Sequence, residues 1–158
     1  MAEPLPWVYD DGGRAAAGRR GHADDCAVRA IAIATGKPYG EVYELVNKYG
    51  RAERTRKSRR TGQPRPKSSA RTGVYGPTFS RIMRDLGWQW YPTMGIGTGT
   101  QVHLAVGELP TLPETRLIAQ VSRHWCAIVN GVIHDTHDPS REGTRAVYGY
   151  WYQPTDFD

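Results

Sequence analysis

The sequence predicts an α+β domain in which N-terminal helices pack on a C-terminal antiparallel β-sheet. Apolar residues recur with helical spacing up to about residue 86, whereas short apolar runs typical of strands follow from residue 88 onward. Two of these runs flank Asn130-Gly131, which is the strongest short signal for a two-residue hairpin. Helices followed by strands are typical of the α+β class. Because 158 residues are about the length of one domain, we expect a single domain over residues 1–158.

Three helices are expected in the first half of the chain. The first begins at Cys26, where Asp24 or Asp25 is a suitable N-cap, and it ends before Gly36. Pro38 suits the first turn of a second helix. The apolar spacing thus predicts helices over residues 26–35, 38–49 and 77–86.

Strands account for most of the second half. A two-residue turn at Asn130-Gly131 fixes the register of its hairpin, so that Val129 faces Val132. Side chains alternate along a strand, and one face of the hairpin therefore carries His124, Cys126, Asp135 and His137. The predicted strands cover residues 88–91, 117–121, 125–129, 132–136 and 146–152, after a short strand or extended arm within residues 1–23.

Cys26 is the candidate nucleophile. It follows the polar loop Gly21-His22-Ala23-Asp24-Asp25 and stands in the first turn of an apolar helix. The N-terminal end of a helix carries about half a positive charge, which favours a thiolate over a thiol. A thiolate in this setting needs a histidine partner, and His124 is the candidate.

His124 and Asp135 are the candidate general base and orienting carboxylate. Asp135 lies diagonally across the hairpin from His124, within reach of a side-chain hydrogen bond. A helix that carries Cys26 across this face would bring the three groups together, as in cysteine hydrolases. The backbone N–H of Cys26 would supply one oxyanion donor. Candidates for the second donor are Gln120, His22 and Asn47, with Asp138 as a supporting residue if the strand ends before it.

These residue types also have structural interpretations. A lone cysteine on an apolar helix is often a core residue, and Cys126 in the middle of a strand is expected to pack in the core. A disulfide between the two cysteines is not expected in a reducing compartment. His134 and His137 are three residues apart and would face opposite sides of a strand, so we expect no metal site and no cofactor.

The basic charge of the protein is concentrated in one segment. The chain has 21 Lys and Arg against 16 Asp and Glu, a net charge of +5. Residues 51–71 hold nine of the basic residues and a single acid, Glu53, so the rest of the chain carries −3. Residues 51–73 contain almost no apolar side chains, and we expect a flexible basic loop there.

This basic loop has two interpretations. It binds nucleic acid or an acidic protein in a salt-dependent way, or it is a solvated loop beside the active site that selects acidic partners or keeps the protein soluble. It contains no aromatic residue for base stacking, so any binding of nucleic acid would be independent of base sequence. The candidate polyanion-binding residues are Arg54, Arg56, Lys57, Arg59, Arg60 and Lys67.

Three runs carry a resemblance to a known group of proteins. They are the run Asp25-Cys26-Ala27-Val28-Arg29-Ala30-Ile31-Ala32-Ile33-Ala34-Thr35-Gly36, the basic stretch that ends Ser69-Ala70-Arg71-Thr72-Gly73-Val74-Tyr75, and the stretch from Ser122-Arg123-His124 through Gly131-Val132-Ile133-His134-Asp135-Thr136. Together they resemble short bacterial and phage proteins that are described as papain-like cysteine peptidases. More distantly, the Cys-bearing helix and His-bearing hairpin are similar to leader-cleaving peptidases of bacteriocin exporters and to cell-wall endopeptidases.

The resemblance implies a papain-like fold with Cys26 as nucleophile, His124 as base and Asp135 in the third position. The chain departs from the papain pattern in one place. Papain relatives carry an oxyanion glutamine shortly before the nucleophile, whereas residues 19–25 contain no Gln or Asn. Another residue must then supply that donor.

The chain has no run that approaches the roughly 20 apolar residues of a membrane span. Its N-terminus also lacks the basic start and apolar core of a secretion signal. We therefore expect no membrane partner and a cytoplasmic protein, located in the host cytoplasm if it is phage-encoded.

The sequence supports one leading hypothesis for function and two alternatives. The leading hypothesis is a cysteine hydrolase that cleaves a peptide, isopeptide or glutamine-type amide of a protein or peptide substrate through a thioester. The first alternative is a weak or inactive papain-like scaffold that binds nucleic acid or an acidic host protein through the basic loop. The second is acyl transfer or deamidation, which the same residues would serve.

Overall fold

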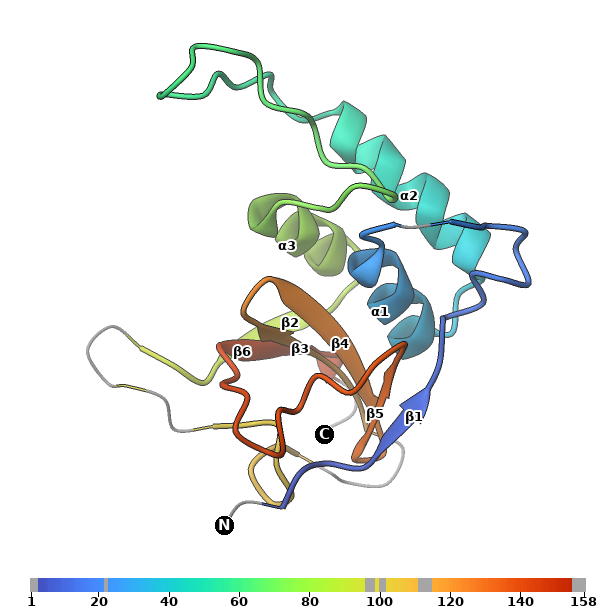
Figure 1. Ribbon diagram of the computed structural model, residues 1–158, viewed down its shortest axis with the longest axis vertical. Coiled ribbons are helices and arrows are strands. Elements are labelled where there is room, and N and C mark those ends of the chain that lie inside the picture. Colours follow the sequence, from blue (N-terminus) through green and yellow to red (C-terminus); the bar gives the residue numbers. More distant parts are fainter. Residues whose placement is uncertain (1–2, 22, 96–98, 100–101, 111–114, 155–158) are drawn as a thin grey trace.

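The computed structural model describes residues 3–154 except 22, 96–98, 100–101 and 111–114. Within these residues, helices gather on one side of a six-stranded sheet (Figure 1). The predicted α+β class is confirmed, with the helices before most of the sheet. The elements are α1 (Cys26–Thr35), α2 (Tyr39–Arg51), α3 (Gly76–Asp85), β1 (Trp7–Tyr9), β2 (Gln89–Pro92), β3 (Arg116–Val121), β4 (His124–Val129), β5 (Val132–Asp135) and β6 (Gly149–Tyr152).

The strands follow the order β1-β5-β4-β3-β6-β2 across the sheet. All neighbouring pairs are antiparallel except β1 and β5, which are parallel. In that pair Trp7 lies opposite Ile133 and Tyr9 lies opposite Asp135. The N-terminal segment therefore forms an edge strand beside the predicted hairpin.

The β4–β5 hairpin has the predicted register. Val129 lies opposite Val132, and Ile128 lies opposite Ile133. The two turn residues, Asn130 and Gly131, have φ values of 53° and 79°. Positive φ at both central positions is the requirement of the tight hairpin turn that matches the twist of the strands.

Helix α1 begins and ends where the sequence predicts. Gly36 ends it in the left-handed conformation, and its N–H donates to the Ala32 carbonyl at 2.9 Å. Asp25 occupies the N-cap position, but its side chain does not cap the helix; its carboxylate binds Arg14 and the buried Arg29 instead. None of the described helices is long and apolar enough to cross a bilayer.

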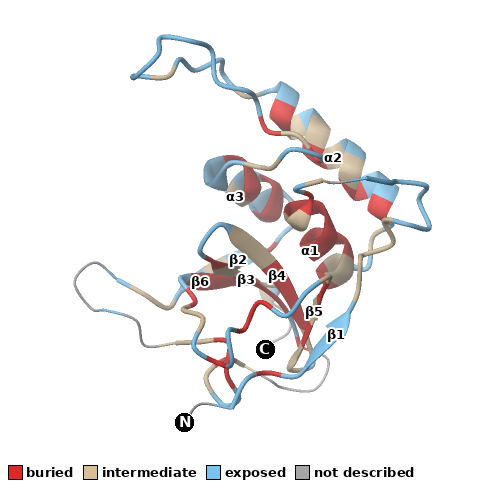
Figure 2. Ribbon diagram, in the orientation of Figure 1, coloured by how far each residue is buried: buried red, intermediate tan, exposed pale blue. Residues whose placement is uncertain are grey.

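The sheet separates two apolar clusters, and the helices cover only one of them (Figure 2). The first cluster joins the buried faces of α1, α2 and α3 to Ile118, Ala127 and Trp151 of the sheet. The second lies on the other face, where loop residues such as Leu104 and Val147 cover the strands. The core is therefore a helix layer, a sheet and a covering of loops.

Helix α1 packs on the opposite face of the hairpin from the one we expected. Trp125 and Ala127 belong to the cluster that contains α1, whereas Cys126 and Ile128 belong to the cluster behind the sheet. The prediction that the helix crosses the face of Cys126 is therefore wrong. The reason is that loops after β2 and β5 already cover that face, and the larger Trp125 ring stacks on Phe79 of α3 instead.

The basic segment forms an arm that extends from the end of α2 and returns to α3 (Figure 1). Its two limbs are joined by backbone hydrogen bonds, including Arg65 N–H to the Arg56 carbonyl at 2.6 Å. We expected this whole segment to lie outside the core. The returning limb differs, because Ser68 and Ala70 are buried. This limb passes directly over Gly50 of α2, where a side chain would collide with the Ser68 carbonyl.

Candidate active site

Cys26 and His124 line one cleft of about 690 Å³ between the helix layer and the end of the sheet. The start of α1 forms one wall, and the turn between β3 and β4 forms another. Residues 72–74 and Gly76, just before and at the start of α3, close a third side, and Thr136 and His137 lie at the end of β5. The cleft therefore combines segments from most of the length of the chain.

His124 and Asp135 meet at the end of the hairpin that lies away from Asn130-Gly131. His124 is the first residue of β4 and Asp135 is the last residue of β5. The His124 Nε2 atom lies 2.6 Å from Asp135 Oδ2. The site thus forms at the ends of β4 and β5. There the side chain of His124 reaches the cleft, although Cys126 on the same face of β4 points away from α1.

The surroundings of His124 favour its protonated form. Burial alone lowers the pKa of the imidazole, but hydrogen bonds and charge interactions with Asp135 and with Cys26 together outweigh burial and raise the pKa to about 9. Because Nε2 contacts Asp135, the other ring nitrogen, Nδ1, remains for the thiol. His124 therefore stands between a carboxylate and the candidate nucleophile.

Asp135 is a buried carboxylate that stays ionised. Burial is the largest single effect and raises its pKa. The hydrogen bond from His124, the positive charge of that ring and the backbone N–H of Thr136 together outweigh burial, so the net pKa lies below its ordinary value. The Thr136 N–H donates to Oδ1 at 2.7 Å. Each carboxylate oxygen is thus held by a separate donor, which fixes the carboxylate plane toward His124.

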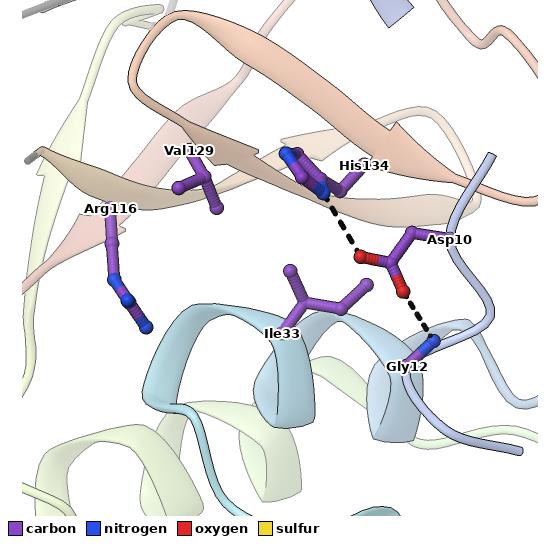
Figure 3. Close-up of a pocket in the computed structure, with 6 residues that line it drawn as sticks. All are labelled: Asp10, Gly12, Ile33, Arg116, Val129 and His134. Atoms are coloured by element: carbon purple, nitrogen blue, oxygen red, sulfur yellow. Dashed lines mark hydrogen bonds and ion pairs between the residues drawn. The ribbon is translucent and has the colours of Figure 1, made fainter. Parts of the chain in front are cut away.

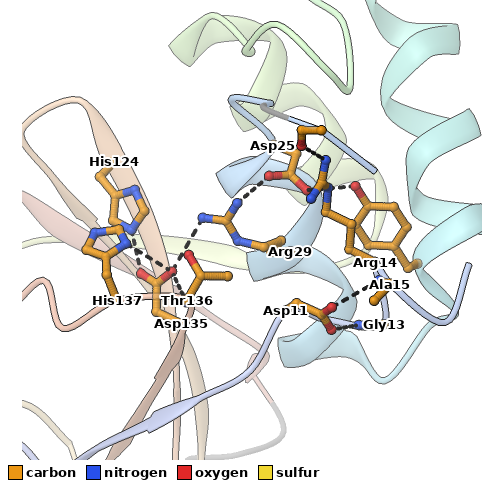
Figure 4. Close-up of polar contacts among 12 residues, drawn as sticks. Asp11, Gly13, Arg14, Ala15, Asp25, Arg29, His124, Asp135, Thr136 and His137 are labelled. Carbon is orange, nitrogen blue, oxygen red and sulfur yellow. Dashed lines mark hydrogen bonds and ion pairs between the residues drawn. The ribbon is translucent and has the colours of Figure 1, made fainter. Parts of the chain in front are cut away.

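Arg29 links the carboxylate of Asp135 to the loop before Cys26 (Figure 4). One guanidinium nitrogen lies 3.4 Å from Asp135 Oδ1, and the other contacts Asp25. Asp25 also accepts a hydrogen bond from Tyr39 Oη at 2.7 Å and pairs with Arg14 at 3.3 Å. A buried chain of charges therefore runs from the loop before the nucleophile to the orienting carboxylate.

Sequence reasoning missed Arg29 as part of the site. The available signal was the spacing of Asp25 and Arg29, because residues four apart on a helix are neighbours. A second signal was the position of Arg29 on a face that is otherwise apolar, since arginine is rarely buried without a partner. Neither signal identifies Asp135 as the second partner.

Cys126 has the structural role that we expected. It is 1% exposed, and burial raises the pKa of its thiol far above the ordinary value. Both cysteines are present as free thiols. Cys126 is therefore a packing residue, and Cys26 is the half-buried thiol that faces the cleft.

The predicted supporting residues have different outcomes. Gln120 of β3 lines the cleft. Asn47 does not, because its side-chain oxygen accepts the Ala70 N–H at 2.9 Å and holds the returning limb of the arm. Asp138 is exposed and binds the Ser140 N–H at 3.0 Å, since the strand has already ended. Neither Asn47 nor Asp138 lines the cleft, and His22 lies outside the described residues.

His134 faces away from His124, as predicted, and lies on the α1 side of the sheet (Figure 3). Its Nδ1 atom lies 2.9 Å from Asp10 Oδ2, and Asp10 also accepts the Gly12 N–H. These groups line a separate hollow of about 320 Å³ beside Ile33. His134 therefore joins the N-terminal segment to the sheet and takes no part in the cleft.

His137 is the second imidazole near Asp135. Its Nδ1 atom lies 3.9 Å from Asp135 Oδ1, and its ring centroid lies 5.0 Å from that of His124. The donor atoms of His124, Asp135 and His137 all lie within 4.8 Å of one another, so these are the described residues that could hold a divalent metal. A metal there would replace the hydrogen bond between His124 and Asp135 and would compete with the role of His124 as a base.

The candidate polyanion-binding residues divide into two groups. Arg54, Arg56 and Lys67 line a pocket between the arm and α3, whereas Lys57, Arg59 and Arg60 lie farther out on the arm. All six are exposed. The arm therefore carries its positive charge both in a formed pocket and at a solvated tip.

Comparison of the chain with family models, curated proteins and solved structures gives no match.

Proposed function

We propose that the chain is a cysteine hydrolase that cleaves an amide bond with Cys26 as nucleophile, His124 as acid and base, and Asp135 as the orienting carboxylate. The observation that carries this proposal is the position of His124, which binds Asp135 through Nε2 and lines the same cleft as Cys26. The raised pKa of the imidazole, to which both Asp135 and Cys26 contribute, supports it. Nucleophile, base and orienting group in this order are the parts of a cysteine hydrolase.

The first half of the reaction forms a thioester. The Cys26 sulfur attacks the carbonyl carbon of the amide, and the carbonyl electrons move to oxygen. The C–N bond then breaks as the protonated imidazole of His124 gives its proton to the leaving nitrogen. Asp135 stays ionised and holds the imidazolium in place, which the raised pKa of His124 supports.

The second half releases the acyl group. His124, now neutral, takes a proton from a water molecule, and the resulting hydroxide attacks the thioester carbonyl. The C–S bond breaks, the thiolate of Cys26 returns and a carboxylic acid leaves. If an amine takes the place of water, the same residues carry out acyl transfer, so the product identifies the reaction.

The oxyanion that forms in both halves needs donors near Cys26. The first turn of a helix leaves backbone N–H groups without intrahelical acceptors, and Cys26 is the first residue of α1. The side chain of Gln120 lines the same cleft from β3. We infer that Gln120 supplies the donor that papain relatives obtain from a glutamine before the nucleophile.

The proposal is tested with a chloroacetamide-capped peptide, an electrophilic probe that alkylates an activated thiol in an amide-binding cleft. The wild-type chain should incorporate one probe molecule, and peptide mapping should locate it on Cys26. Cys26→Ala should lose the label, whereas the buried Cys126 should stay unmodified in both proteins. Equal labelling of wild-type protein and Cys26→Ala would contradict the proposal.

A further inference from the structure

A pocket of about 360 Å³ between the arm and α3 gathers five cationic side chains. They come from three separate parts of the chain, namely the outgoing limb of the arm, its returning limb and the middle of α3. We call this the cation pocket. Its cationic residues are Arg54, Arg56, Arg65, Lys67 and Arg81.

The cation pocket has little internal neutralisation. Its lining includes one acid, Glu53. The two oxygens of Glu53 accept hydrogen bonds from the Ser68 N–H, at 2.7 Å, and from the Thr78 hydroxyl. Among the described residues, no ion pair within 4.0 Å involves any of the five cations. Five like charges around one hollow repel one another, and a bound anion would relieve this repulsion.

Hydrogen bonds between the two limbs of the arm fix the shape of the cation pocket. Arg65 N–H donates to the Arg56 carbonyl, and Ser58 N–H donates to the Gln63 carbonyl at 2.8 Å. These bonds keep the two limbs side by side. On the α3 side, the Tyr75 hydroxyl donates to the Pro66 carbonyl at 2.6 Å. The cations of both limbs are therefore presented to one space.

The cation pocket and the Cys26 cleft share a wall. Gly76, the first residue of α3, lines both. Residues 72–74 before it face the cleft, whereas Tyr75 and residues 77–78 face the cation pocket. The two spaces are therefore adjacent along the start of α3.

We propose that the cation pocket is the part of the substrate site that binds an acidic or phosphorylated segment of a polypeptide, while another part of the same polypeptide lies at Cys26. This inference rests on the proposed hydrolase function. A polypeptide is favoured over a nucleic acid because the neighbouring cleft carries groups that act on an acyl carbon. The substrate class is therefore anionic polypeptides.

The ligand chemistry follows from the guanidinium groups. Four of the five cations are arginines, and each guanidinium offers a planar pair of N–H donors that matches a carboxylate or a phosphate. Glutamate, aspartate and phosphoserine side chains all present such groups. Clusters of these side chains on one segment would engage several arginines together.

The test uses the full chain with Cys26→Ala, so that a bound peptide is not consumed. Fluorescence anisotropy would measure binding of a labelled ten-residue Glu-rich peptide, its phosphoserine counterpart, a Gln-rich peptide of the same length and a single-stranded oligonucleotide. Two double variants remove equal charge from the arm. Arg54→Gln with Arg56→Gln alters the cation pocket, and Arg59→Gln with Arg60→Gln alters the tip of the arm.

The pocket variant should bind the Glu-rich or phosphoserine peptide at least about tenfold more weakly, because two charge-assisted hydrogen bonds are lost. The tip variant should lose less than about threefold, which is the effect of a screened, exposed charge. Comparison of the two anionic peptides would tell whether carboxylates or phosphates are preferred. Thermal melting would check that both variants fold.

Three results would overturn the proposal: equal losses in the two double variants, binding of the oligonucleotide but of neither anionic peptide, and anionic-peptide binding no tighter than that of the Gln-rich peptide. Alkylation of Cys26 in the wild-type chain is measured separately. The hydrolase proposal and the anionic-substrate proposal can therefore fail independently.

Discussion

His124 Nε2 lies 2.6 Å from Asp135 Oδ2, and this contact joins the first residue of β4 to the last residue of β5. His124 and Cys26 line the same cleft, and the contact leaves the other ring nitrogen of His124 available for the thiol. The contact therefore connects the hairpin register, which is a property of the fold, to the protonation of the imidazole, which is a property of the chemistry.

Asp135→Asn should lower the pKa of His124 from about 9 toward its ordinary value of 6.5, because the variant removes a charged acceptor from the imidazolium. NMR titration of the His124 ring would measure this shift. Alkylation of Cys26 at pH 7 should also slow up to about fourfold, since a fall of the pKa from about 9 to 6.5 leaves only about a quarter of the imidazole protonated. An unchanged His124 titration would show that Asp135 does not hold the ring.

The raised pKa of His124 also predicts how stability depends on pH. The pKa is about 9 in the folded chain and about 6.5 in the unfolded chain, so folding takes up a proton between these values. The stabilisation is complete below about pH 6.5 and is lost as pH rises toward 9. Urea unfolding of wild-type protein and His124→Gln across this range would measure it, and the variant should lack this part of the pH dependence. Parallel curves for the two proteins would contradict the prediction.

Arg29→Met should destabilise the fold by about 3–5 kcal/mol, because Asp25 and Asp135 would both remain buried without this cation. Lys37→Met is the matched control. Lys37 pairs with Glu41 at 3.7 Å, also four residues apart, but both side chains are exposed. That control should cost less than about 1 kcal/mol in urea unfolding. Similar losses of unfolding free energy in the two variants would mean that the buried ion pairs of Arg29 stabilise the fold no more than an exposed pair does.

Gly50→Ala should detach the returning limb of the arm from α2. A Cβ atom at this position would lie 1.9 Å from the Ser68 carbonyl oxygen, so the limb must move, at a cost of about 1–3 kcal/mol. Gly40→Ala on the same helix meets nothing within 4 Å and should stabilise by up to about 1 kcal/mol. Thermal melting would compare the two, and a neutral effect of Gly50→Ala would contradict the close approach.

Local sequence signals predicted most of the secondary structure. Asn130 and Gly131 define a turn whose backbone requires positive φ, and the register of β4 and β5 follows from that turn alone. Gly36 ends α1 for a similar local reason. Such features depend on neighbours in the sequence, so the sequence is sufficient to predict them.

The features that could not be predicted from the sequence depend on packing between distant parts of the chain. The face of β4 that receives α1 depends on which loops cover the other face, and those loops are distant in the sequence. The parallel pairing of β1 with β5 has no local signal for the same reason. Arg29 reaches Asp135 only because α1 and β5 lie side by side, so its place in the site could not be predicted from the residues around it.

The most direct test of the central claim is the rate at which iodoacetamide alkylates Cys26 at pH 6, compared between the wild-type chain and His124→Gln. If His124 holds a thiolate, the wild-type rate should exceed the variant rate at least about tenfold in the folded proteins, and the two rates should agree after unfolding in urea. Equal rates in the folded proteins would show that Cys26 and His124 do not form a catalytic pair.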